Sequence, residues 1–167
     1  MKKKDKKNLL REYLPYIIII LVIILIRTFI ITPVRVSGDS MYPTLTNGEI
    51  MILDKLSSIN RYDIVVIDKS IAGDEIIKRV IGLPGDSIEV VGGKLFINDE
   101  EIDDKYGSGT TGDFNKTYLK NDEYFVMGDN RSVSLDSRVF GKIKKDKIKG
   151  VTNFILFPIN RFGVVEN

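Results

Sequence analysis

Ser40 and Lys78 are the two residues of this chain whose types and surroundings could perform covalent chemistry. The sequence contains neither histidine nor cysteine. It therefore cannot build a Ser-His-Asp triad, a Cys-His protease site or an ordinary zinc site. A serine nucleophile would have to lose its proton to another base. Lysine can act as that base when burial disfavours its charged form and lowers its pKa.

Lys78 lies in an apolar run, between the isoleucines 76–77 and the apolar pair 80–81. A lone serine before a proline turn, such as Ser40, is ordinarily only a turn residue, and a lysine beside Arg79 could simply be solvated. Strand alternation places Lys78 and Arg79 on opposite faces, however, which lets the lysine point inward. Lowering a lysine pKa from about 10.4 to about 8 costs about 3 kcal/mol, which an apolar pocket can impose. The pattern predicts a serine–lysine hydrolase.

The first element that positions these residues is a long apolar segment near the N-terminus. Residues 14–31 are almost wholly apolar, and a helix of about 18 residues spans about 27 Å, close to the hydrocarbon thickness of a bilayer. We expect a cytoplasmic basic tail over 1–12, a transmembrane helix over 13–32, and an extracytoplasmic domain over 33–167. The charges that set this orientation are Lys2, Lys3, Lys4, Lys6, Lys7 and Arg11, against Asp5 and Glu12.

The apolar segment has two other possible interpretations. A cleavable secretory signal shares its pattern, but the run is long for a signal and no small-x-small site follows it, since residues 28–31 are bulky. A buried helix of a soluble protein would need a polar face to meet water, which the isoleucine run does not leave. We therefore favour an uncleaved anchor in the cell membrane.

Residues 33–167 are numerous enough for one globular domain with its own core. Without the basic tail, the charges of this domain nearly balance and are slightly acidic, which argues against nucleic acid as a partner. The basic tail is better explained by membrane orientation and by the anionic headgroups of the lipid bilayer. We expect no metal and no cofactor.

Short segments rich in isoleucine and valine follow Pro33 and are separated by turn residues. Segments 87–91 and 94–97 flank a Gly-Gly turn and predict a hairpin. Residues 104–120 are polar and rich in glycine and predict a mobile loop, so that 87–121 would form a small cap. The whole pattern predicts a mostly β domain with coiled, barrel-like antiparallel sheets. Further strands are expected at 32–36, 49–54, 63–68, 75–81, 124–127 and 150–157.

Four sequence blocks behind the apolar segment occur in the order known from one protein family. They are GDSMYPT (38–44), YDIVV (62–66), KRVIGLPGD (78–86) and GDNRSVSLDSR (128–138). The chain resembles the type I bacterial signal peptidases, of the single-span kind common in Gram-positive bacteria. The resemblance implies a membrane-anchored serine endopeptidase that cleaves signal peptides from exported preproteins after small residues at −1 and −3.

The resemblance also implies roles for individual residues. Ser40 would be the nucleophile, with its backbone N–H as an oxyanion donor, and Lys78 would be the general base. Ser134 would support the site by hydrogen-bonding the lysine. Asp136 and Arg138 would form an ion pair beneath the site. Four charged residues would support the structure of the site and take no part in the reaction; they are Asp129, Arg131, Asp136 and Arg138.

Gly38 departs from part of the family, in which a serine two residues before the nucleophile completes the oxyanion hole. Ser37 is displaced by one residue and does not inherit that role, so the backbone N–H of Ser40 must carry more of the stabilisation. The substrate would lie as an extended strand between the segments that precede the serine and the lysine. Val36 and Ile77 would then be walls of the pocket for small side chains, although core packing explains both equally well.

Two other classes of protein share parts of this pattern. A self-cleaving transcriptional regulator shares the serine–lysine core but cuts an Ala-Gly or Cys-Gly bond upstream of the serine and carries a DNA-binding head. The only Ala-Gly here, at 72–73, lies downstream of Ser40. An inactive membrane-anchored relative acting as a scaffold is disfavoured because Ser40, Lys78 and Ser134 are all present. The partners implied are signal peptides of secreted preproteins and the lipid bilayer, and the resemblance also admits the secretion translocon.

Overall fold

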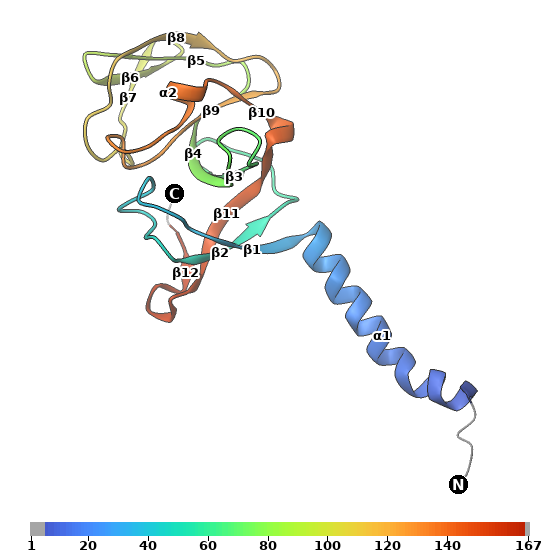
Figure 1. The fold of residues 1–167 in the computed structure, drawn as a ribbon. Helices are drawn as coiled ribbons and strands as arrows, with labels where there is room; N and C mark the ends of the chain where they lie inside the picture. The colour runs from blue at the N-terminus through green and yellow to red at the C-terminus, as the bar shows by residue number, and fades with distance from the viewer. Residues whose placement is uncertain (1–5, 166–167) are drawn as a thin grey trace.

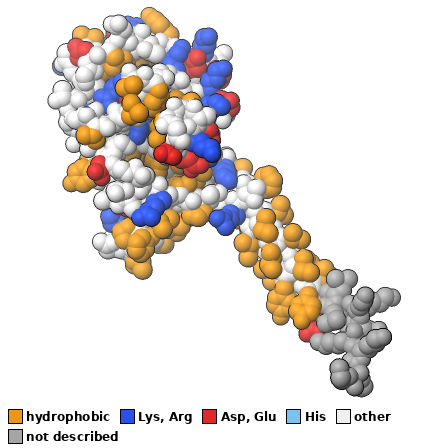
Figure 2. All heavy atoms as spheres, viewed as in Figure 1, with side chains coloured by type: hydrophobic (Ala, Val, Ile, Leu, Met, Phe, Trp, Pro, Cys, Tyr) orange, Lys and Arg blue, Asp and Glu red, His pale blue; other side chains and the backbone are white. Residues whose placement is uncertain are grey.

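The computed structural model describes residues 6–165. The first five residues of the tail expected over 1–12 and the last two of the domain expected over 33–167 therefore lie outside the described residues. Helix α1 (Lys6–Phe29) projects from a β-rich body (Figure 1). Its segment Arg11–Phe29 is long and apolar enough to cross a membrane, and none of it is buried inside the protein. Figure 2 shows hydrophobic side chains along its visible face.

Helix α1 ends before the end of the span expected over 13–32, because strand β1 (Ile31–Arg35) already begins at Ile31. Thr32 donates a hydrogen bond from Oγ1 to the carbonyl of Arg27 at 2.9 Å, which satisfies one of the carbonyls that a helix end leaves free. β1 then pairs antiparallel with β2 (Ile50–Asp54). Helix α1 therefore runs almost directly into the sheet.

The larger sheet has eight strands in the order β1-β2-β11-β3-β4-β9-β10, with β12 paired to β11. Every pairing in it is antiparallel, and the sheet curls around itself (Figure 1). This confirms the predicted mostly β domain with barrel-like antiparallel sheets. Its other strands are β3 (Ile64–Ile67), β4 (Ile76–Gly82), β9 (Glu123–Met127), β10 (Ile143–Lys144), β11 (Ile148–Phe157) and β12 (Gly163–Val164).

A second sheet of four strands has the order β7-β6-β5-β8. The hairpin expected on either side of the Gly-Gly turn forms β5 (Ser87–Val91) and β6 (Lys94–Ile97), and β7 (Glu100–Ile102) follows. Strand β8 (Phe114–Tyr118) lies inside the segment 104–120, which sequence analysis treated as a loop. β8 pairs with β5 and packs only in part against the core, so its sequence lacks the apolar run that marks the other strands.

Three short helical turns complete the described elements. They are α2 (Ser137–Phe140), η1 (Lys145–Lys147) and η2 (Ile159–Arg161). Buried apolar side chains form three clusters, and β4 contributes to all three. Because both faces of β4 are covered, a polar side chain on either face must find a partner inside the protein.

Candidate active site

Ser40 lies in the turn between β1 and β2, where apolar neighbours hold the chain against the larger sheet. Met41 and Leu45 are 1% and 0% exposed and belong to the core. The Leu45 N–H donates to the Met41 carbonyl at 2.9 Å, which closes one helical turn after the serine. Gly38 has a φ of 79°, a conformation that glycine adopts without strain. The chain can therefore reverse just before Ser40 and present its side chain to solvent on one side.

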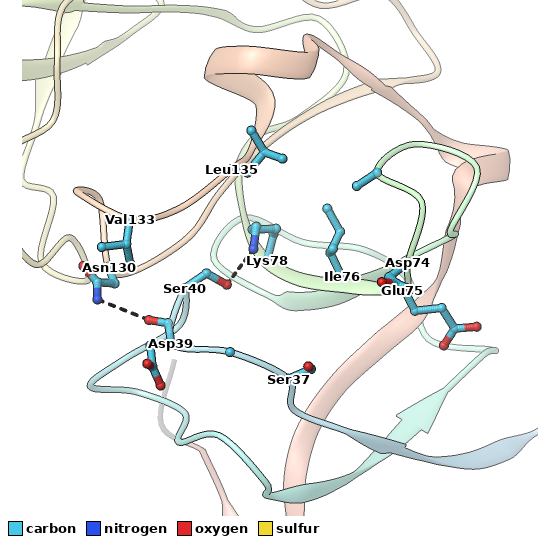
Figure 3. Close-up of a pocket in the computed structure, with 12 residues that line it drawn as sticks. Ser37, Asp39, Ser40, Asp74, Glu75, Ile76, Lys78, Asn130, Val133 and Leu135 are labelled. Atoms are coloured by element: carbon cyan, nitrogen blue, oxygen red, sulfur yellow. Dashed lines mark hydrogen bonds between the residues drawn. The ribbon is translucent and has the colours of Figure 1, made fainter.

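Lys78 lies on β4, opposite Val65 of β3, and is 3% exposed. Its Nζ is 2.6 Å from Oγ of Ser40 (Figure 3). Burial lowers the pKa of Lys78 from 10.5 to about 8. The negative charges of Asp136 and Asp129 oppose this shift by raising the pKa, and the positive charge of Arg138 adds to it by lowering the pKa. The structure thus brings together the two residues that sequence analysis paired, and it gives the lysine a neutral form near physiological pH.

Arg79 follows Lys78 on β4 and is fully buried on the opposite face. Its Nε and Nη2 donate to the two carboxylate oxygens of Asp129 at 2.9 and 2.7 Å. The ring of Tyr106 lies 3.9 Å from its guanidinium carbon, within the range of a cation–π contact. Sequence reasoning gave Arg79 no role. The only signal that pointed to it was its place beside Lys78 in the same sequence block.

The turn after β9 holds the nucleophile segment in place. The Asn130 backbone N–H donates to the Ser40 carbonyl at 3.0 Å, and its Nδ2 donates to the Asp39 carbonyl at 3.2 Å. The hydroxyl of Thr44 donates to Asp129 Oδ2 at 2.5 Å. Asp129 thus connects the serine-bearing turn to the arginine of β4. A structural supporting role is the one that the resemblance implies for Asp129, and it stays a prediction.

The other charged residues of this block also bind within the scaffold. Arg138 donates from Nε and Nη2 to the two carboxylate oxygens of Asp136, each at 2.8 Å. The Asp136 carboxylate also accepts the Gly128 N–H at 2.9 Å. Arg131 donates from Nη2 to Asp104 at 2.7 Å, which fixes the turn to the segment 104–120. These contacts supply the ion pair expected between Asp136 and Arg138.

Ser134 lies beside Gly128 with its Oγ buried. Within the described part of the chain, it forms no hydrogen bond with Lys78, in contrast to the contact that the resemblance implied. The side chain of Ser134 and the carbonyl group of Ser40 both lie close to the backbone of Gly128. A Cβ at position 128 would lie 2.2 Å from Ser134 Oγ and 2.5 Å from the Ser40 carbonyl oxygen. Only glycine allows this approach.

A cleft of about 930 Å³ opens beside Ser40 and Lys78. Val36 and Ile77, the predicted pocket walls, are 2% and 8% exposed and pack in the apolar core instead of lining this cleft. For Ile77 the reason is the alternation of β4, which turns residue 76 and the lysine to one side and residue 77 to the other. Val36 follows β1 and packs in the same core cluster as Ile77. The apolar lining of the cleft comes from Ala72, Ile76, Val133 and Leu135, and the last three are labelled in Figure 3.

Comparison with known families gives one match over most of the chain. The family described as "Signal peptidase, peptidase S26" matches residues 10–157. Signal peptidase I of Bacillus licheniformis is 39% identical, with 95% of each chain covered. Signal peptidase I S of Bacillus subtilis (strain 168) is 37% identical, with 93% of this chain and 92% of that protein covered.

A solved structure agrees with these relatives. The crystal structure of a signal peptidase I from Enterococcus faecalis V583 is similar with a TM-score of 0.51 and 31% sequence identity. The similarity covers 57% of this chain and 97% of that chain.

Proposed function

This chain belongs to the signal peptidase family, peptidase S26, and on that premise we propose that Ser40 is its nucleophile and Lys78 its general base. Membership makes the protein a serine peptidase that acts on the signal peptides of preproteins. The 2.6 Å contact between Lys78 Nζ and Ser40 Oγ is the observation that carries the proposal. It is supported by the burial that lowers the pKa of Lys78 to about 8.

Acylation begins when neutral Lys78 takes the proton of the Ser40 hydroxyl. Oγ forms a bond to the carbonyl carbon of the scissile peptide, and the carbonyl electron pair moves onto its oxygen. The backbone N–H of Ser40 donates to this oxyanion. The C–N bond then breaks, the protonated lysine gives its proton to the leaving amine, and an acyl-enzyme remains.

Deacylation repeats the same steps with water. Lys78 takes a proton from a water molecule as its oxygen bonds to the acyl carbon. The second tetrahedral intermediate collapses, the bond to Ser40 Oγ breaks, and the lysine returns the proton to the serine. The signal peptide leaves with a free carboxyl group, and the enzyme is restored.

The substrate would enter the cleft as an extended strand, with small side chains at −1 and −3. Such a strand can share backbone hydrogen bonds with the segments that precede Ser40 and Lys78. Because residues 33–167 would lie outside the cytoplasm, the cleft would meet the preprotein on the side to which it is exported. Lipid headgroups would contact the basic tail, and the secretion translocon would deliver the substrate.

A peptide assay tests this function. The full-length chain in detergent should cleave an Ala-x-Ala peptide after its second alanine and lose most of its rate when that alanine is leucine, because a small pocket excludes larger side chains. The Ser40→Ala variant is the matched control and should show no cleavage. Equal rates for alanine and leucine, or a Ser40→Ala variant as active as the unchanged protein, would refute the proposal.

A further inference from the structure

Position 38 of this chain cannot supply a side-chain donor to an oxyanion, because it is glycine. The backbone N–H of Gly38 is also engaged, since it donates to Oδ1 of Asn47 at 3.2 Å. The hydroxyl of Ser37 lies toward the far end of the cleft from Ser40 (Figure 3). The peptide that links Asp39 to Ser40 is therefore the main candidate for oxyanion binding in this turn.

Asn130 holds that peptide from one side. Its Nδ2 donates to the Asp39 carbonyl at 3.2 Å, and the same carbonyl accepts the Tyr42 N–H at 3.1 Å. The backbone N–H of Asn130 donates to the next carbonyl, that of Ser40, at 3.0 Å. One residue thus holds the carbonyl groups on both sides of the nucleophile.

The orientation of the Ser40 N–H follows from these contacts. In a planar trans peptide, the N–H and the C=O point in opposite directions. The Asp39 carbonyl points toward Asn130, on the side of the cleft opposite Ile76 (Figure 3). The Ser40 N–H therefore points toward the side where Ile76 and Lys78 line the cleft. Among residues 6–165, no hydrogen bond takes up this N–H.

We propose that Asn130 is the positioning residue of the oxyanion donor, and this inference rests on the proposed role of Ser40 as nucleophile. Its side-chain amide fixes the plane of the Asp39–Ser40 peptide and so aims the Ser40 N–H at the developing charge. A hydrogen bond accepted by the carbonyl also polarises the N–H of the same peptide. The amide thereby offsets the missing side chain at Gly38.

The test uses the full-length chain in detergent and the variant Asn130→Ala. This variant keeps the backbone contact to Ser40 and removes only the side-chain amide. We expect kcat to fall about tenfold, the usual effect of losing one neutral hydrogen bond, with KM nearly unchanged. Activity should rise with pH as Lys78 loses its proton, and the apparent pKa of this rise should stay the same, because no charge near Lys78 has changed. Asn47→Ala is the matched control, since it removes an amide contact to the same turn that does not involve the Ser40 peptide.

A pair of inhibitors separates positioning from general damage to the fold. A peptide aldehyde adds the Ser40 hydroxyl across its C=O bond, so that Oγ bonds to carbon and the proton ends on the former carbonyl oxygen, which occupies the oxyanion position. Its affinity for Asn130→Ala should fall about as much as kcat, because a transition-state mimic reports the same interaction. A non-cleavable peptide with a reduced scissile bond should bind both proteins equally.

A second variant, Asn130→Asp, keeps the side-chain size and removes the donor. Its maximal rate should also stay low, while its activity limb moves to higher pH because of the added negative charge. The inference is overturned by an unchanged kcat in both variants, by a loss confined to KM, or by failure of both to fold. Full activity of Ser40→Ala would refute the proposed function instead, so the two failures can be told apart.

Discussion

Leu135 offers a way to shift the proposed base without disturbing the core. Its side chain is 54% exposed and lines the cleft near Lys78 (Figure 3). Replacement by aspartate would add a carboxylate to the charges that already act on the lysine, which are those of Asp136, Asp129 and Arg138. A nearby negative charge favours the protonated lysine and raises its pKa.

The size of the effect follows from the starting pKa of Lys78, about 8. At pH 7, about one lysine in ten is then neutral and able to act as a base. A new carboxylate that is partly exposed to solvent should raise the pKa by about 1 unit, the lower end of the range for close charge pairs. The neutral fraction at pH 7 then falls to about one in a hundred, which predicts an activity about tenfold lower.

The assay is kcat/KM for an Ala-x-Ala peptide from pH 6 to 10. Leu135→Asp should lose about tenfold at pH 7 and recover most of its activity at the alkaline end. Leu135→Asn is the control, because asparagine is a polar side chain of the same size as aspartate but carries no charge. The same activity limb in both variants would show that Lys78 is not the titrating base.

Three further outcomes follow from the structure. Arg79→Met should lower the free energy of unfolding by about 3–5 kcal/mol in denaturant titrations, because it leaves the Asp129 carboxylate buried without its partner; a change below about 1 kcal/mol would contradict this. Gly128→Ala should abolish peptide cleavage, since its Cβ would lie 2.5 Å from the Ser40 carbonyl oxygen; normal turnover would show that the turn can move. Lys120→Cys, the sole thiol in a chain without cysteine, should react with a membrane-impermeant reagent in intact, wall-stripped cells; labelling only after permeabilisation would reverse the proposed orientation.

The pairing of Ser40 with Lys78 could be predicted because the chain leaves few chemical options. Without histidine or cysteine, a buried lysine is the remaining base for a serine. The β5–β6 hairpin was also predictable, since its Gly-Gly turn and alternating residues are local signals. The hairpin is predicted by neighbouring residues, whereas the serine–lysine pair is predicted by the residue types that the whole chain lacks.

Other features depend on contacts between distant segments. Strand β8 forms because β5 offers it an edge, which its own polar sequence does not reveal. Arg79 is buried because both faces of β4 are covered, and its partner Asp129 lies 50 positions away in sequence. The choice of Ile76 over Ile77 as a cleft residue follows from the alternation of β4, which puts residue 76 on the same side as Lys78. The expectation for Ile77 came from the resemblance and not from this alternation.

The serine–lysine mechanism is tested most directly by Lys78→Arg. Arginine keeps the positive charge and much of the volume of lysine, but it stays protonated in proteins and has no accessible neutral form. The full-length variant should fold and remain membrane-bound, yet show no cleavage of an Ala-x-Ala peptide even at pH 10. Near-normal turnover by the folded variant would contradict the mechanism.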